Sequence, residues 1–173
     1  MNIHDDHLYH GAALIQISEH EQFTAINSLK TGGEVVRVAY RINDDIAVYL
    51  KYATKPTKTF EEYPFTFTKK HLDELVAISS ANPKTFVALV CVKNRAICCI
   101  SYQQLQALIA QRQKAKGAPE DQYVVLVTMP EGKSFRVYVN APGVRKTALG
   151  KMLKVPRNAF PTSIFNGHLD GHH

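Results

Sequence analysis

The alternation of apolar and polar residues between Glu34 and Lys58 is the clearest pattern in the chain. Apolar side chains occupy every second position from Val36 to Ile42 and again from Ile46 to Tyr52. This period of two is typical of half-buried strands. Asn43-Asp44-Asp45 separates the two runs, and such residues favour turns, so we expect a β-hairpin here.

The length of the turn decides which residues share a face with Lys51, because a slip of one residue in antiparallel pairing reverses the faces. A two-residue loop pairs Ile42 with Asp45 and puts Glu34 on the face of Lys51, but it also sets apolar against charged residues. A three-residue loop pairs Ile42 with Ile46 and leaves one wholly apolar face. We prefer the three-residue loop, which further predicts the pairs Tyr40–Val48, Val38–Leu50 and Val36–Tyr52. The opposite face then carries Arg37, Arg41, Tyr49 and Lys51.

The remaining patterns predict further helices and strands. We expect a helix over 11–30, with a break near His20 as the alternative to a continuous helix. We expect further helices after the N-cap Thr68, after the capping box Ser101–Gln104, and over 149–155. We expect strands over 63–67, 85–92, 96–100, 123–128 and 135–139, of which 85–92 is apolar enough to be buried on both faces.

This order of elements predicts an α/β or α+β fold, with one mixed central β-sheet flanked by helices and a C-terminal β-hairpin. With 173 residues and 45% hydrophobic residues, the chain is long enough for one sizeable core. We therefore expect a single globular domain over residues 1–160 and a flexible tail over 161–173. Residues 1–10, with three histidines, are expected to form a solvated arm.

Charge and cysteine content narrow the class of protein. The formal net charge is +6, a balance that favours polyanionic partners only slightly. No apolar run is long enough to span a membrane, and the first residues lack the layout of a signal peptide, so we expect a cytoplasmic location. The odd number of cysteines, three, argues against a disulfide framework. The adjacent Cys98 and Cys99 fit a redox or soft-metal pair, but we prefer the interpretation that at least one of them is a small core residue.

Several segments resemble the PD-(D/E)XK, or restriction-endonuclease-like, superfamily. The segments that carry the likeness are 47–52, 65–72, 86–92 and 97–105, and the resemblance spans about residues 9–109. It implies a restriction-endonuclease-like core in which Lys51 is the family lysine of an acid-x-Lys motif. Tyr49 stands where the family has an acidic residue or glutamine.

The resemblance also implies a chemistry, in which carboxylates hold Mg²⁺ beside the lysine and the metal stabilises phosphodiester charge. The candidate catalytic residues are Lys51, Glu34 and Asp45, and Glu34 and Asp45 are the candidate metal ligands. If the chain is an enzyme, we expect a metal-dependent nuclease with Mg²⁺ as its cofactor.

Three functions remain open at this point. The first is a nucleic-acid-associated protein of nuclease-like fold with an incomplete metal site, whose partner is DNA or RNA. Its phosphate contacts would be Arg37, Arg41, Lys51, Lys55, Lys58, Arg145 and Lys146. The second is an active Mg²⁺-dependent endonuclease. The third is a non-catalytic interaction protein that forms homo-oligomers through its apolar sheet and final hairpin.

Overall fold

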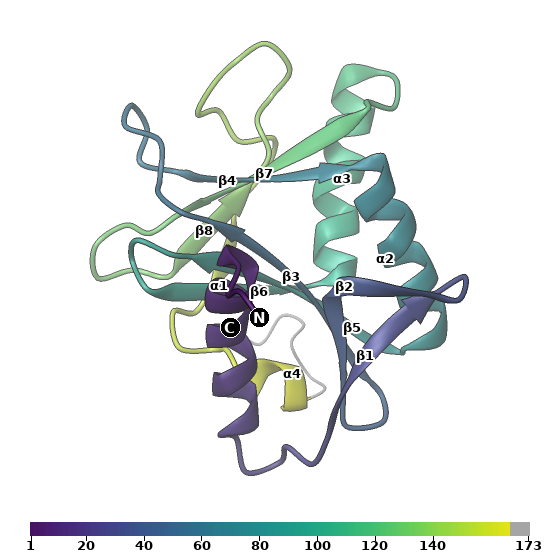
Figure 1. The fold of residues 1–173 in the computed structure, drawn as a ribbon. Helices are drawn as coiled ribbons and strands as arrows, with labels where there is room; N and C mark the ends of the chain where they lie inside the picture. Colours follow the sequence, from purple (N-terminus) through teal and green to yellow (C-terminus); the bar gives the residue numbers. More distant parts are fainter. Residues whose placement is uncertain (167–173) are drawn as a thin grey trace.

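The computed structural model describes residues 1–166 (Figure 1). The helices are α1 (Asp5–Ser18), α2 (Lys69–Ala81), α3 (Tyr102–Lys116) and α4 (Thr162–Asn166). The strands are β1 (Ile26–Thr31), β2 (Glu34–Ile42), β3 (Ile46–Ala53), β4 (Tyr63–Thr68), β5 (Lys84–Cys91), β6 (Ala96–Ser101), β7 (Gln122–Thr128), β8 (Phe135–Tyr138) and β9 (Leu153–Val155). None of the helices within residues 1–166 is long and apolar enough to cross a bilayer.

The strands form two sheets, and the fold is of the α+β class. A five-stranded sheet has the order β1-β2-β3-β5-β6, and a four-stranded sheet has the order β4-β7-β8-β9. The first sheet is mixed, because β3 and β5 are parallel while its other neighbours are antiparallel. The predicted C-terminal hairpin is present as β7 and β8, but it belongs to the second sheet together with β4.

The predicted three-residue turn of the first hairpin is confirmed. The ladder between β2 and β3 consists of the pairs Ile42–Ile46, Arg41–Ala47, Tyr40–Val48 and Ala39–Tyr49. The predicted pairs Val38–Leu50 and Val36–Tyr52 are absent from it. On the other side of β2, Ser28 pairs with Tyr40 but Leu29 pairs with Val36, so three residues of β2 have no partner on β1. Such a bulge bends and twists a strand, and β2 parts from β3 beyond this point.

Both faces of β3 are buried, which corrects the expectation of one apolar and one basic face. Val48 and Leu50 pack in a core cluster with Ile17 of α1 and Ile164 of α4. On the opposite face, Tyr49 packs in a second cluster formed with α2, α3 and the four-stranded sheet. The second sheet and α2 cover the part of the predicted basic face that holds Tyr49 and Lys51, whereas Arg37 and Arg41 on β2 remain exposed.

The predicted helix over 11–30 is wrong in its second half. α1 begins earlier, at Asp5, and ends at Ser18, whereas Ile26 and Leu29 lie on β1. Gly32 and Gly33 have φ angles of 59° and 84°, which form the turn between β1 and β2 rather than ending a helix. The early start of α1 also corrects the predicted N-terminal arm, since His10 is buried.

Two predictions for the C-terminal region are also corrected. The segment expected as a helix over 149–155 contains the strand β9, which pairs with β8. The tail expected from residue 161 begins too early, because α4 packs on the first sheet through the fully buried Ile164. The remainder of that predicted tail, 167–173, lies outside the described residues.

All three cysteines are buried and unpaired, which goes beyond the expectation that at least one of Cys98 and Cys99 is a core residue. Burial raises the pKa of the Cys91 and Cys99 thiols to about 12, and it raises the pKa of Cys98 as well. Thiols react as thiolates, so these groups are inert core residues at neutral pH.

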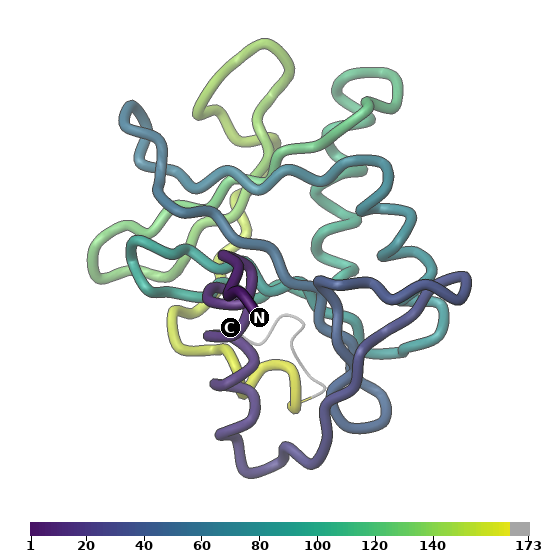
Figure 2. The backbone as a smooth tube through the Cα atoms, in the orientation of Figure 1, coloured from purple at the N-terminus to yellow at the C-terminus, as the bar shows by residue number. Residues whose placement is uncertain are grey.

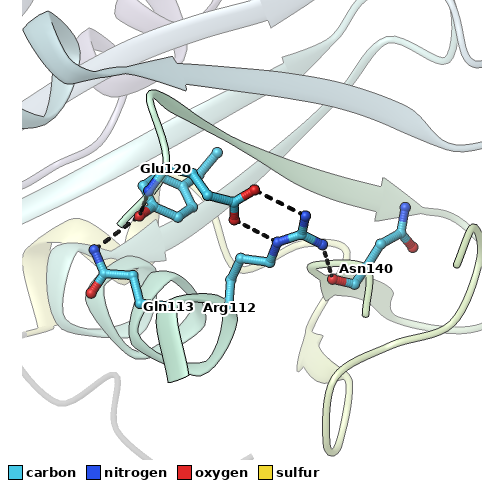
Figure 3. A network of polar contacts seen from close by, with 5 residues as sticks. Arg112, Gln113, Glu120 and Asn140 are labelled. Carbon is cyan, nitrogen blue, oxygen red and sulfur yellow. Dashed lines mark hydrogen bonds and ion pairs between the residues drawn. The ribbon is translucent and has the colours of Figure 1, made fainter. Parts of the chain in front are cut away.

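Arg112 joins the end of α3 to the second sheet (Figure 3). Its guanidinium donates two hydrogen bonds to the Glu120 carboxylate, at 2.7 and 3.1 Å, and one to the Asn140 carbonyl, at 2.7 Å. The Tyr123 hydroxyl accepts hydrogen bonds from the Glu120 N–H and the Gln113 amide. A bidentate pair of this kind is geometrically specific and stronger than neutral hydrogen bonds.

We expect Arg112→Met to lower the free energy of unfolding by about 2 kcal/mol, because it removes charge-assisted hydrogen bonds from a partly buried carboxylate. Urea unfolding curves of the two proteins measure this loss. Lys114→Met is the matched control, since Lys114 is exposed on the same helix and should change stability by less than about 0.5 kcal/mol. Equal losses in both variants would contradict a structural role for the Arg112 network.

Candidate functional site

Lys51 lies half-buried on β3, on the face that α2 covers. Its Nζ is 3.2 Å from Nδ1 of His71, in the first turn of α2. The same ammonium group lies 4.9 Å from the centre of the Phe67 ring, on β4, in the geometry of a cation–π contact. Lys51 therefore sits between the two sheets rather than on an open surface.

His71 also caps α2, and this fixes its ring. The Thr68 hydroxyl accepts a hydrogen bond from the His71 N–H, and the Thr68 N–H donates to His71 Nδ1 at 3.2 Å. Because a backbone N–H can only donate, Nδ1 carries no proton in this arrangement. The single lone pair of this nitrogen is therefore shared between the Thr68 N–H and the Lys51 ammonium group, which both lie 3.2 Å from it.

Tyr49 and Glu74 complete the cluster. The Tyr49 hydroxyl donates a hydrogen bond of 2.8 Å to Oε1 of Glu74. Burial, the hydrogen bond and the negative charge of Glu74 together raise the pKa of the Tyr49 phenol far above its usual value. Tyr49 thus remains neutral and positions the carboxylate near Lys51.

The ionisation of Lys51 and His71 is set by burial. Burial lowers the pKa of Lys51 to about 8, and the charge of Glu74 opposes part of this change. Burial lowers the pKa of His71 too, and the positive charge of Lys51 adds to the effect. At neutral pH the pair consists of a neutral imidazole and an ammonium group that loses its proton just above neutrality. Such a pair can exchange protons, but it supplies no set of hard ligands for Mg²⁺.

The structure does not bring Glu34 and Asp45, the predicted metal ligands, to Lys51. Glu34 is exposed beside the turn of the β1–β2 hairpin, opposite Thr31 and beyond the paired part of β2 and β3. Asp45 forms an ion pair of 3.1 Å with Lys84 at the start of β3. At roughly 3.3 Å per residue along a strand, Asp45 lies on the order of 20 Å from Lys51. Within residues 1–166, no three His, Cys, Asp or Glu side chains gather closely enough to hold a metal ion.

The predicted phosphate contacts fall into separate groups. Arg37 and Arg41 are exposed on β2, and Lys51 is in the cluster just described. Lys55 and Lys58 lie in the loop between β3 and β4, and Arg145 and Lys146 lie in the loop between β8 and β9. The ammonium group of Lys146 lies 5.5 Å from the centre of the Phe60 ring in the β3–β4 loop. Two loops far apart in sequence are therefore in contact (Figure 2).

The turn between β5 and β6 adjoins the β3–β4 loop and the start of β4. The Lys93 N–H donates a hydrogen bond of 3.0 Å to the Thr54 carbonyl, and Asn94 is hydrogen-bonded to the Tyr63 hydroxyl. Lys93 and Arg95 therefore lie beside the lysines of the β3–β4 loop. Neither residue was predicted from the sequence as a phosphate contact. The sequence held one indication of this arrangement. The apolar run 85–92 is typical of a buried parallel strand, and paired parallel strands end at the same edge of a sheet, so the residues that follow them lie close together.

We call six of the exposed cations on these three segments the basic end. Lys151, which is also exposed in the β8–β9 loop, is left out because it lines a separate hollow beside α3. The basic end consists of Lys55, Lys58, Lys93, Arg95, Arg145 and Lys146. Two carboxylates lie on the same segments, but only Glu61 is exposed, because Glu62 is buried and accepts a hydrogen bond from the Tyr138 hydroxyl. The balance of exposed charge at the basic end is strongly positive.

Comparisons of this chain with protein families, with curated proteins and with solved structures find no match. Its function is therefore argued from the geometry of its own residues.

The lowered pKa of Lys51 predicts a pH dependence of stability. The unfolded chain keeps a lysine pKa near 10.5, whereas the folded value is about 8. Between these values the unfolded state binds more protons, so the free energy of unfolding contributed by Lys51 rises with pH. We expect the stability of the wild type, relative to Lys51→Met, to rise from pH 8 to pH 10.

Urea unfolding at several pH values in this interval measures the difference between the two proteins. Subtracting the variant removes the titration of tyrosines that both proteins share. Lys30→Met, which changes an exposed lysine on β1, is the control and should run parallel to the wild type. A Lys51→Met curve parallel to the wild type would show that Lys51 titrates as an ordinary solvated lysine.

Proposed function

We propose that this chain binds nucleic acid through the basic end and does not cleave it with Lys51, Glu34 and Asp45. The observation that carries the proposal is the contact between Lys146 and Phe60, 5.5 Å from nitrogen to ring centre. This contact holds the β3–β4 and β8–β9 loops together, so that the cations of both loops lie close enough to contact one nucleic acid. A phosphate backbone presents closely spaced negative charges, which several cations on one surface can contact together.

The cations of the basic end are available for such contacts. Within the described part of the chain the ion pairs are Lys84–Asp45 and Arg112–Glu120, and neither includes a residue of the basic end. Figure 1 shows the β3–β4 loop and the β5–β6 turn extending from the left of the molecule, with the β8–β9 loop above them. Phosphate contacts of this type position a protein on a nucleic acid without reading its sequence.

We also propose that the protein has a nuclease-like fold, and the order of its elements supports this. α1 precedes the antiparallel meander β1-β2-β3, and α2 leads to β5, which is parallel to β3. This is the order expected for the core of the superfamily that the sequence resembles. The wide separation of Asp45 from Lys51 and the engagement of Lys51 with His71 favour binding over metal-dependent cleavage.

Fluorescence anisotropy with labelled duplex and single-stranded DNA tests the proposal. We expect binding that weakens as salt rises, with a log–log slope that falls by about one for each phosphate contact removed. Lys146→Glu should weaken binding several-fold and reduce this slope. Lys30→Glu makes the same change of charge on β1, away from the basic end, and should leave both quantities near the wild-type values.

Two outcomes would contradict the proposal. One is the absence of salt-dependent binding to either form of DNA at low salt. The other is an equal loss of affinity in Lys146→Glu and Lys30→Glu, because the effect would then reflect only the net charge of the protein.

A further inference from the structure

A hollow of about 680 Å³ lies where four segments of the chain meet. These segments are the C-terminal half of α1, the β5–β6 turn, the β7–β8 turn and the stretch that follows β9. Residues that line it include Gln16, Arg95, Ile97, Lys133, Arg157 and Phe160. Its volume is within the range of ligand sites in proteins, roughly 300–1,000 Å³.

The charged side chains that line the hollow are all positive. Arg95, Lys133 and Arg157 come from three different segments, and no carboxylate lines the hollow with them. None of the three forms an ion pair with a carboxylate of residues 1–166. Like charges that converge without a counter-charge repel one another, so an anion in the hollow would relieve that repulsion. Guanidinium groups match phosphate oxygens in geometry as well as in charge.

Arg157 is held in place before any ligand arrives. Its Nη1 donates a hydrogen bond of 3.2 Å to the Lys133 carbonyl. Its guanidinium carbon lies 5.0 Å from the centre of the Phe135 ring. A charged group that packing and hydrogen bonds already orient loses less conformational entropy on binding.

Arg95 occupies a strained backbone position. Its φ angle is 52°, in the left-handed region that glycine and asparagine adopt more readily than arginine. The turn itself needs only a residue that tolerates this conformation, and arginine is a costly choice for that purpose. Asn43, Glu61 and Lys146 share this conformation, so the strain supports a functional role for Arg95 only together with its position in the hollow.

We propose that this hollow binds a phosphate monoester of nucleotide size. The three cations would hold the dianionic phosphate, and the apolar side chains of Ile97 and Phe160 would contact the flat base. The proposal goes beyond nucleic-acid binding at the basic end and does not depend on it. The phosphate could belong to a free nucleotide or to the phosphorylated end of an oligonucleotide, which share this chemistry.

Calorimetric titration with adenosine monophosphate tests the hollow directly, with Arg95→Asn and Lys93→Asn as a matched pair. Each variant removes one positive charge from the same turn, but only Arg95 lines the hollow. We expect Arg95→Asn to weaken binding about tenfold, the loss typical of one charge-assisted contact, and Lys93→Asn to change it little. Because asparagine tolerates a positive φ, Arg95→Asn should unfold at the same temperature as the wild type or higher.

Further probes distinguish the source of the phosphate. One outcome is that the protein prefers an oligonucleotide with a terminal phosphate over the same oligonucleotide with a terminal hydroxyl and does not bind adenosine monophosphate. This outcome supports phosphate binding in the hollow and assigns the site to the ends of polymers. Binding of the free nucleotide supports it as a nucleotide site. Binding of neither probe, or equal losses in Arg95→Asn and Lys93→Asn, would overturn the proposal.

Lys146→Glu separates this inference from the function proposed above. It should weaken DNA binding while leaving the affinity for adenosine monophosphate unchanged, because Lys146 does not line the hollow. Nucleotide binding in a protein that fails to bind DNA would refute the basic-end proposal alone. DNA binding without Arg95-dependent phosphate binding would refute only the proposal that the hollow binds a phosphate monoester.

Discussion

The parallel pairing of β3 with β5 constrains the path of the whole chain. The two strands are in register from Ile46 beside Lys84 to Ala53 beside Cys91. Parallel neighbours require a connection that returns along the length of the sheet, and β4 and α2 provide it here. Because both strands end at one edge, the loop after β3 and the turn after β5 leave the sheet side by side. This pairing brings together the cations of these two segments, and the contact of Lys146 with Phe60 adds those of the β8–β9 loop.

The same connection explains the environment of Lys51. β4 leaves the first sheet and pairs with β7 in the second sheet, and α2 then crosses the face of β3 that carries Tyr49 and Lys51. Burial of that face lowers the pKa of Lys51 to about 8 and sets its ammonium group beside His71. In the hairpin alone, Lys51 would lie on an open basic face. The second sheet and α2 bury it in part, so the exposed positive charge lies on the loops.

The features that were predictable from the sequence are those set by neighbouring residues. The alternation around Asn43-Asp44-Asp45 gave the correct pairing of Ile42 with Ile46. The predicted N-cap Thr68 and the predicted capping box at Ser101 correctly placed the starts of α2 and α3, because capping hydrogen bonds lie within one helical turn. The apolar run from residue 85 likewise identified a strand buried on both faces.

The features that were missed depend on pairing between distant segments. Ile26 and Leu29 have a spacing of three that fits a helix, and only the pairing of β1 with β2 makes this segment a strand. The second sheet depends on the pairing of Tyr63 with Val127, which no local pattern indicates. For the same reason, the candidate carboxylates Glu34 and Asp45 matched a catalytic pattern along the chain although the fold does not bring them to Lys51.

Chemical-shift mapping during titration with a short DNA duplex is the most direct test of nucleic-acid binding at the basic end. If DNA binds at the basic end, the perturbed amides belong to the loop 54–62, the turn 92–95 and the loop 139–152, while the amides of Arg37 and Arg41 on β2 stay unchanged. Perturbations confined to β2, or none at a low salt concentration, would contradict this proposal.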